Sequence, residues 1–187
     1  MSIIDDFLTD AREHMDKSVD ATRGKFGSVR TGRATPALLD RIMVDYYGTQ
    51  TPLKQLATVS APEARLLTVQ PYDKGSIKAI ERAIQESDVG LTPNNDGQLI
   101  RLQVPELTEE RRKQLVKVVR GLAEEGKIAI RNIRRDVMHD LRELRESGEA
   151  GSDDEHRAEE HLQKLTDDKV KELDALVKSK EDEILEV

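Results

Sequence analysis

The residues with the clearest chemical potential in this chain are the cations between Arg111 and Arg135. This segment holds nine basic residues and two acidic ones, a local net charge of +7 in a chain whose formal charge is −7. Only Glu124 and Glu125 are available within the segment to neutralise it, so it predicts a polyanion-binding surface. A solvated helix face is the alternative. At about 100° per residue, five cations fall within roughly a 60° sector and form what we call the basic stripe: Lys113, Arg120, Lys127, Arg131 and Arg134.

A long amphipathic helix must carry this stripe. Thr108 is a plausible N-cap, with two glutamates in the first turn, and the helical period continues to about Glu146. The apolar residues cluster roughly 140° away from the stripe by the same helical arithmetic, so one face should pack and the other should meet solvent or phosphate. The residues predicted for the packed face are Leu115, Val119, Leu122, Ala129, Ile133, Val137 and Leu144.

Two further helices are predicted at the ends of the chain. The first covers roughly residues 1–30 and contains Gly24 and Gly27, which we expect to have close packing neighbours because glycine weakens a helix interior. The last follows a turn at residues 147–154, with Ser152 and Glu155 as a capping box. This helix is acidic, in contrast to the basic stripe, because the chain from Glu146 to its end has 15 acids and 6 bases.

The middle of the chain has a different pattern. Short apolar runs at residues 42–47, 66–69 and 99–104 predict strands, and residues 76–87 predict one helix. Glycine and proline supply the breaks between them, at Gly48, Pro52, Pro62, Pro71 and residues 93–97.

The predicted fold class is therefore α+β. Residues 1–30 and 106–187 should form a three-helix bundle, and residues 31–105 an inserted β/α/β domain. Two backbone connections, near residues 31–36 and 104–106, make a hinge, in which we expect Gly32 and Pro105 to bend.

Composition and motifs argue against most enzyme classes. The absence of cysteine removes disulfides, thiolate metal sites and thiol nucleophiles. Neither a phosphate-binding G-x-x-x-x-G-K-[ST] loop nor a G-x-S-x-G elbow occurs. His156 and His161 are five residues apart, whereas helical zinc ligands are four apart, so we expect neither metal nor cofactor. The acidic start and the lack of a long apolar run predict a cytoplasmic protein without a membrane span.

Tyr46 and Tyr47 precede a turn at Gly48. Because alternate strand residues face opposite ways, one ring is expected in the core and the other half-exposed. An exposed ring could instead anchor a protein contact, and stacking on RNA bases is disfavoured because no basic groove surrounds it.

Four segments, in the same order and at the same spacing, resemble the bacterial ribosome recycling factor family. The resemblance covers essentially the whole chain and is carried by these motifs: residues 29–34 (VRTGRA), 44–48 (VDYYG) with 51–53 (TPL), 107–113 (LTEERRK) and 130–136 (IRNIRRD).

The resemblance implies an L-shaped, tRNA-sized, non-catalytic and monomeric protein. Members of the family bind the large ribosomal subunit after termination, and elongation factor G with GTP then drives subunit separation. An arginine of the R-N-x-R-R motif contacts ribosomal RNA, and the matching positions are Arg131, Arg134 and Arg135. The resemblance and the charge pattern together give these RNA-binding candidates: Arg131, Arg134, Arg135, Lys127, Arg120, Lys113, Arg30 and Arg33.

The physical reading agrees with this function. Arginines can meet phosphates bidentately without reading bases, which suits a structured RNA better than DNA. The acidic last helix should then face away from the RNA. Two alternatives are a coiled-coil-like adaptor or chaperone that docks an acidic protein, and a small-molecule enzyme, for which the sequence shows no acid/base pocket.

Overall fold

The computed structural model describes residues 2–186, which form two compact units. The helical unit comprises the chain up to Arg30 together with Glu110–Glu186, and the sheet unit comprises Thr31–Glu109. The α+β prediction, with long helices and a sheet-containing insertion, is confirmed.

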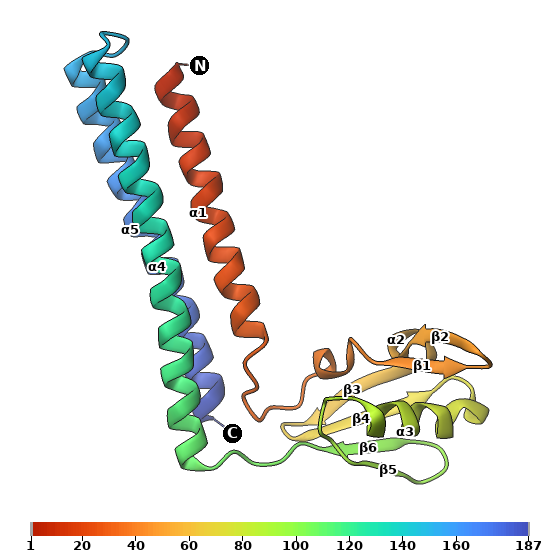
Figure 1. The fold of residues 1–187 in the computed structure, drawn as a ribbon. Helices are drawn as coiled ribbons and strands as arrows, with labels where there is room; N and C mark the ends of the chain where they lie inside the picture. Colours follow the sequence, from red (N-terminus) through yellow and green to blue (C-terminus); the bar gives the residue numbers. More distant parts are fainter. Residues whose placement is uncertain (1, 187) are drawn as a thin grey trace. The chain divides into compact units, whose positions relative to one another are not determined.

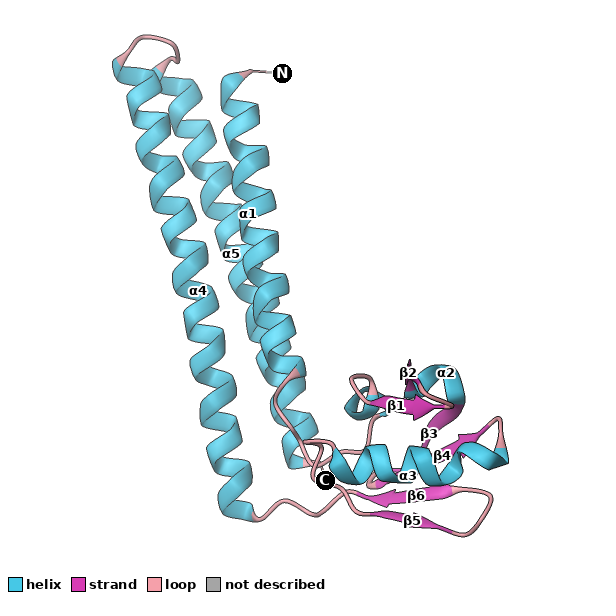
Figure 2. Cartoon of the chain, turned by 45° about the vertical axis from the view of Figure 1, so that its right-hand side comes forward, coloured by secondary structure: helices cyan, strands magenta, loops and turns pink. Residues whose placement is uncertain are grey.

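Three long helices make up the helical unit: α1 (Ile3–Gly27), α4 (Glu109–Glu146) and α5 (Ser152–Leu185). They run side by side, with α4 antiparallel to the other two, and the start of α1 lies at the same end as the α4–α5 turn (Figures 1 and 2). Apolar side chains from all three helices meet in one core, which includes Met15, Ile130 and Leu162. No helix in the described part of the chain is both long and apolar enough to cross a membrane.

The packing of glycine in this unit differs from the expectation. Gly24 and Gly27 have no atoms within 4 Å of the place where a Cβ would stand, so the prediction of close neighbours there is wrong. The close approach is at Gly126 on α4, where a Cβ would fall on Thr22 Oγ1 of α1 and 3.2 Å from a methyl carbon of Leu173 on α5. Gly126 therefore lies at a place where side chains of α1 and α5 come close to the backbone of α4.

The predicted capping box of the last helix is also wrong. Gly151 is the N-cap of α5, no side chain caps it, and Ser152 is already helical. The Glu155 side chain instead turns inward and forms an ion pair with Arg145 near the end of α4. A capping box occurs at the start of α1, between Ser2 and Asp5.

The sheet unit contains two antiparallel sheets and short helices. Strands β1 (Met43–Tyr46) and β2 (Thr49–Pro52) form a hairpin, while the four-stranded sheet has the order β3-β4-β6-β5. Two 3₁₀ turns cover Pro36–Leu39 and Lys74–Ser76. The remaining elements are α2 (Leu53–Leu56), β3 (Ala57–Glu63), β4 (Leu66–Pro71), α3 (Ile77–Glu86), β5 (Pro93–Asn95) and β6 (Ile100–Gln103).

The core of the sheet unit lies between the four-stranded sheet and α3. In the register of β4 and β6, Leu67 faces Leu102 and Val69 faces Ile100, and all four side chains are fully buried. Helix α3 contributes its buried isoleucines to the same cluster. Residues 93–95 and Pro62, predicted as breaks, lie instead in β5 and β3, which are the two edge strands where proline is tolerated.

Candidate nucleic-acid interface

The basic stripe lies at the edge of the packed face of α4 and not opposite to it. Ala123, Ile130 and Leu141 are buried, and they shift the centre of the packed face to roughly 90° from the stripe by helical arithmetic. Leu122, Ala129, Ile133 and Val137, which were predicted for the core, are only half-buried. Lys127 and Arg134 are consequently half-buried at the border between α4 and its neighbour.

Three stripe residues bond to α5 along the line where the two helices lie side by side, which we call the α4–α5 seam. Arg120 Nε donates to Glu181 Oε1 at 2.6 Å, and this carboxylate raises the pKa of the guanidinium. Lys127 forms an ion pair with Asp174. Arg134 Nη1 donates to Gln163 Oε1 at 2.9 Å.

The seam corrects two expectations. The stripe was predicted to lack carboxylates because residues 111–135 contain only two, yet α5 supplies carboxylates to Arg120 and Lys127. The acidic last helix was expected to face away from the stripe, yet several of its polar side chains reach it. A phosphate would therefore compete with α5 carboxylates at two of the five stripe positions.

Residues 131–135 of α4 carry accessible positive charge. Arg131 has 54% of its side chain exposed and forms an ion pair with Glu124 at 3.2 Å. Arg135 is 75% exposed and lies 3.9 Å from the Asp136 carboxylate. Exposed pairs of this kind contribute little free energy, so both guanidinium groups can exchange partners readily. With Arg134 they form what we call the arginine cluster: Arg131, Arg134 and Arg135.

The remaining predicted RNA-binding residues are Lys113, Arg30 and Arg33, and all three are exposed. Lys113 is exposed near the start of α4. Arg30 and Arg33 are both exposed, at the end of the first segment of the helical unit and near the start of the sheet unit, respectively. Arg33 belongs to the sheet unit, whereas the arginine cluster belongs to the helical unit.

Sequence reasoning also missed residues of this surface. Lys117 and Arg142 are exposed on α4 and share roughly a 40° sector with Arg131 and Arg135. Helical arithmetic alone could have included them. No local signal marks Gln163, Asp174 and Glu181 as partners, because they lie 29 to 61 residues from the cations they contact.

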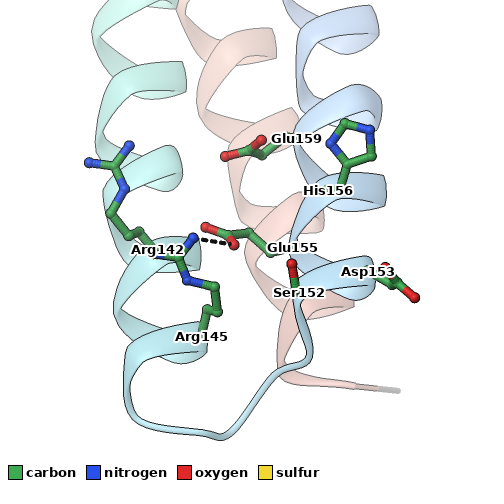
Figure 3. Close-up of a pocket in the computed structure, with 7 residues that line it drawn as sticks. All are labelled: Arg142, Arg145, Ser152, Asp153, Glu155, His156 and Glu159. Atoms are coloured by element: carbon green, nitrogen blue, oxygen red, sulfur yellow. Dashed lines mark hydrogen bonds and ion pairs between the residues drawn. The ribbon is translucent and has the colours of Figure 1, made fainter.

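A second candidate site lies at the end of the bundle where α4 turns into α5. It is a polar depression of about 300 Å³, in which Arg145 Nη1 bonds Glu155 Oε2 at 2.9 Å (Figure 3). Its acidic side chains outnumber its arginines, which disfavours a phosphate ligand. Its lining residues are Arg142, Arg145, Ser152, Asp153, Glu155, His156 and Glu159. Within residues 2–186 no three His, Cys, Asp or Glu side chains are grouped as a metal site requires.

The two adjacent tyrosines form a local cluster in the sheet unit. Tyr46 is half-buried and Tyr47 is 78% exposed, so neither ring lies in the core as one was expected to. Both hydroxyls donate to Asp73 Oδ2 at 3.2 Å, and the rings meet edge to face with centroids 4.6 Å apart. Burial raises the pKa of Tyr46 and the Asp73 hydrogen bond raises that of Tyr47, while the Gly75 N–H lowers the pKa of Asp73.

Comparison with known proteins matches the chain to one family in both units. The family model of the ribosome recycling factor matches residues 22–185. The chain belongs to the ribosome recycling factor family. It is 55% identical to the ribosome-recycling factor of Rubrobacter xylanophilus over 96% of this chain and 97% of that protein. It is 52% identical to that of Carboxydothermus hydrogenoformans over 99% and 100%.

Solved structures give the same family. A solution structure of the ribosome recycling factor matches 100% of both chains with a TM-score of 0.79 and 38% identity. A second match is the T. thermophilus ribosome recycling factor, in a structure with E. coli elongation factor G bound to the E. coli post-termination complex. It covers 99% of this chain and 100% of that one, with a TM-score of 0.65 and 46% identity. Membership of this family assigns the chain to ribosome recycling in translation.

Proposed function

We propose that the chain binds the large ribosomal subunit of post-termination complexes through ribosomal RNA. With elongation factor G in its GTP form, it then promotes subunit separation and release of the ribosome from mRNA. The proposal is supported by models of a ribosome recycling factor and of elongation factor G bound to a post-termination complex, the first of which this chain matches. It describes a non-catalytic, cytoplasmic monomer that needs neither a cofactor nor a metal and binds neither DNA nor membranes.

The arginine cluster is the observation that carries the RNA contact. Three guanidinium groups lie within five residues of one helix, and none of them is enclosed by protein carboxylates. A guanidinium presents a planar fork of donors that matches phosphate oxygens, and it needs no base to read. Lys113, Arg120, Lys127, Arg30 and Arg33 are proposed to add to this surface. Arg120 and Lys127 should contribute less because α5 carboxylates compete for them.

Replacing Arg134 tests the contact directly. Arg134→Ala should weaken binding to large subunits by about 1 to 3 kcal/mol through the loss of charge-assisted hydrogen bonds. Folding should be nearly unchanged, within about 0.5 kcal/mol, as for most surface substitutions. Arg134→Lys should restore only part of the affinity, because an ammonium lacks the planar fork.

Arg157 provides a matched control for the same change of charge. It is an exposed arginine on the acidic helix α5, outside the proposed surface. Arg157→Ala should therefore bind subunits like the unmodified chain in the same co-sedimentation assay. Equal losses in both variants would show that only overall charge matters, and normal affinity of Arg134→Ala would remove Arg134 from the site.

Salt dependence tests the electrostatic basis of the same contact. Each phosphate contact releases counterions and contributes roughly −0.7 to −0.9 to the slope of log K against log salt. A surface with five or six cations in contact should therefore give a steep slope. Affinity that stays constant as salt rises severalfold would contradict an RNA contact made by charge.

Two backbone hydrogen bonds inside the sheet unit limit where the proposed hinge can bend. Ala34 N donates to Ala64 O at 2.7 Å, and Val104 N donates to Arg65 O at 2.8 Å, so both connections are anchored at the β3–β4 turn. Gly32 and Pro105 lie just outside these anchors, where bending breaks no sheet hydrogen bond. We therefore keep both as hinge residues.

Substitution of Gly32 is a poor test of this hinge. Its φ of +75° is in the left-handed region, and a Cβ there would stand 2.8 Å from Leu107 Cγ. Proline, whose φ is near −65°, would deform the connection as well as stiffen it.

Labels give a cleaner measurement of the hinge, because the chain has no cysteine of its own. We expect a Lys17→Cys, Lys78→Cys variant, with one exposed dye in each unit, to show several distances by single-molecule fluorescence transfer. Addition of large subunits should then select among them. One narrow distance that is the same in the free and bound chain would exclude a working hinge.

A further inference from the structure

The three contacts of the α4–α5 seam differ in the chemistry of the α5 partner. Arg120 and Lys127 each meet a carboxylate, of Glu181 and Asp174 respectively. Arg134 meets Gln163, whose amide is neutral. Of the three cations, Arg134 is therefore the one that is held at the seam without being neutralised there.

The orientation of the Gln163 amide is set by its two neighbours. A guanidinium can only donate, so the amide oxygen must face Arg134. A carboxylate can only accept, so the amide nitrogen faces Asp167, to which Nε2 donates at 2.9 Å. Asp167 is one turn further along α5 and holds the acceptor in place without touching the guanidinium itself.

A neutral acceptor orders an arginine without cancelling its charge. One hydrogen bond restricts the long side chain, which reduces the conformational entropy lost when a phosphate binds. The remaining guanidinium donors of Arg134 have no other hydrogen bond within the described residues 2–186. A carboxylate at the same place would both order the side chain and compete with a phosphate for it.

We propose that Gln163 is a positioning residue for RNA binding, which presents Arg134 as an ordered cation with its full charge. This inference rests on the proposed function, in which Arg134 contacts ribosomal RNA. The alternative is a purely structural role, in which Gln163 only holds α4 and α5 together. The two roles differ because the structural role depends on the hydrogen bond, whereas the positioning role depends on the absence of charge at residue 163.

A charge-transposed variant separates these roles. The double substitution Gln163→Glu, Asp167→Asn keeps the net charge of the chain and keeps a hydrogen-bonded link from Arg134 through residue 163 to residue 167. It moves the carboxylate from beside the amide to beside the guanidinium. Asp167→Asn alone is the matched control, because it removes the carboxylate while residue 163 stays neutral.

We expect the transposed variant to bind large subunits about fivefold to tenfold more weakly, as for loss of one charge-assisted contact. Its slope of log K against log salt should become shallower by roughly 0.7 to 0.9, the value of one phosphate contact. Its melting temperature should not fall. Asp167→Asn alone should bind at least as tightly as the unmodified chain.

The decisive measurement combines the transposed variant with Arg134→Ala. Because the carboxylate acts through Arg134, the combined variant should bind no more weakly than Arg134→Ala alone. Additive losses, or a weaker transposed variant with an unchanged salt slope, would overturn the positioning role. If Arg134→Ala weakens binding and the transposed variant does not, the positioning role fails while the proposed function stands. If Arg134→Ala binds normally, Arg134 is not a contact, and the RNA site and the role of Gln163 fail together.

Discussion

The two units of the molecule differ in how some of their carboxylates are bonded. In the sheet unit, carboxylates bond to the backbone of their own turns: Asp45 accepts from Gly48 N–H and Asp73 from Gly75 N–H. In the helical unit, Arg120 pairs with Glu181 of another helix. Local bonds of the first kind shape turns, whereas distant bonds of the second kind tie the lateral position of one helix to that of another.

The largest effect is expected where the helical unit depends most on distant packing. Gly126→Ala should destabilise this unit by about 1 to 3 kcal/mol, because a methyl group there would overlap Thr22 Oγ1 and crowd Leu173, so that these side chains must shift. Thermal unfolding followed by far-UV circular dichroism measures the loss. The tyrosine signal reports on the sheet unit alone, because all three tyrosines lie in it and the chain has no tryptophan, and it should be unchanged.

Gly121 is the matched control on the same helix. It is exposed, and nothing lies within 4 Å of its missing Cβ. Gly121→Ala should therefore stabilise the helical unit by up to about 1 kcal/mol, through helix propensity alone. If both substitutions act in the same direction, tight three-helix packing at Gly126 is not what sets the stability of this unit.

A smaller effect is expected at the α4–α5 turn. Arg145→Met should destabilise the helical unit by about 1 to 2 kcal/mol, because it leaves the buried Glu155 carboxylate without its partner. Adding Glu155→Leu should recover part of this loss, since the unpaired charge is then gone. Chemical denaturation of the single and double variants measures both steps, and a double variant less stable than Arg145→Met would contradict a pair held together by charge.

The same contrast of distances explains which parts of the fold could be predicted. The long helices follow from a 3.6-residue period, and β4 and β6 from their apolar residues, because central strands are buried on at least one face. Strands β3 and β5 were missed since they are edge strands that contain Pro62 and Pro93. The polar hairpin strand β2 offered no apolar alternation to detect.

The sequence predicted the cations of the site but not the α5 residues that they contact. Charge segregation and family resemblance both indicated Arg131 and Arg134, and the resemblance added Arg135. The burial of Ala123, Ile130 and Leu141 then decided which cations border the core, and the helical period alone does not show which side of the apolar face packs. Which residue of α5 lies opposite Arg134, an acid or an amide, depends on the tertiary register of the two helices, and a single sequence does not contain that register.

The turn chemistry of the sheet unit predicts an acid-dependent effect. Hydrogen bonds from Arg101 and from the Gln98 and Leu99 N–H groups lower the pKa of Asp96 to about 2, from an ordinary value of 3.8. A lowered folded-state pKa stabilises the fold above the unfolded value and loses this contribution as pH falls through the folded one. The Asp96 contribution should therefore disappear between about pH 4 and pH 2.

Asp96→Asn isolates this contribution. The variant should be less stable than the unmodified chain at neutral pH, and the two should converge towards about pH 2 when unfolding of the sheet unit is followed by the tyrosine signal. A constant difference across the whole range would show that Asp96 acts through its shape and not through its charge. The helical unit should show no such convergence in far-UV circular dichroism.

The smallest expected effect lies at alkaline pH, in the tyrosine cluster of the sheet unit. The pKa values of Tyr46 and Tyr47 are raised above 10.0, so the folded state favours the protonated phenols. This contribution is complete below about pH 10 and is lost as pH rises through the raised values. Replacing the shared acceptor by Asp73→Asn should move tyrosinate absorbance to lower pH, because the carboxylate no longer opposes ionisation of the hydroxyls beside it. The amide oxygen introduced by this substitution can still accept from Gly75 N–H, so the turn itself should persist.

Asp45→Asn is the control, since that carboxylate bonds only to the neighbouring Gly48 turn among the described residues. If both variants shift the absorbance equally, the cause is the general charge of the sheet unit. If only Asp73→Asn does, the hydrogen bonds to Asp73 set the ionisation of the two tyrosines.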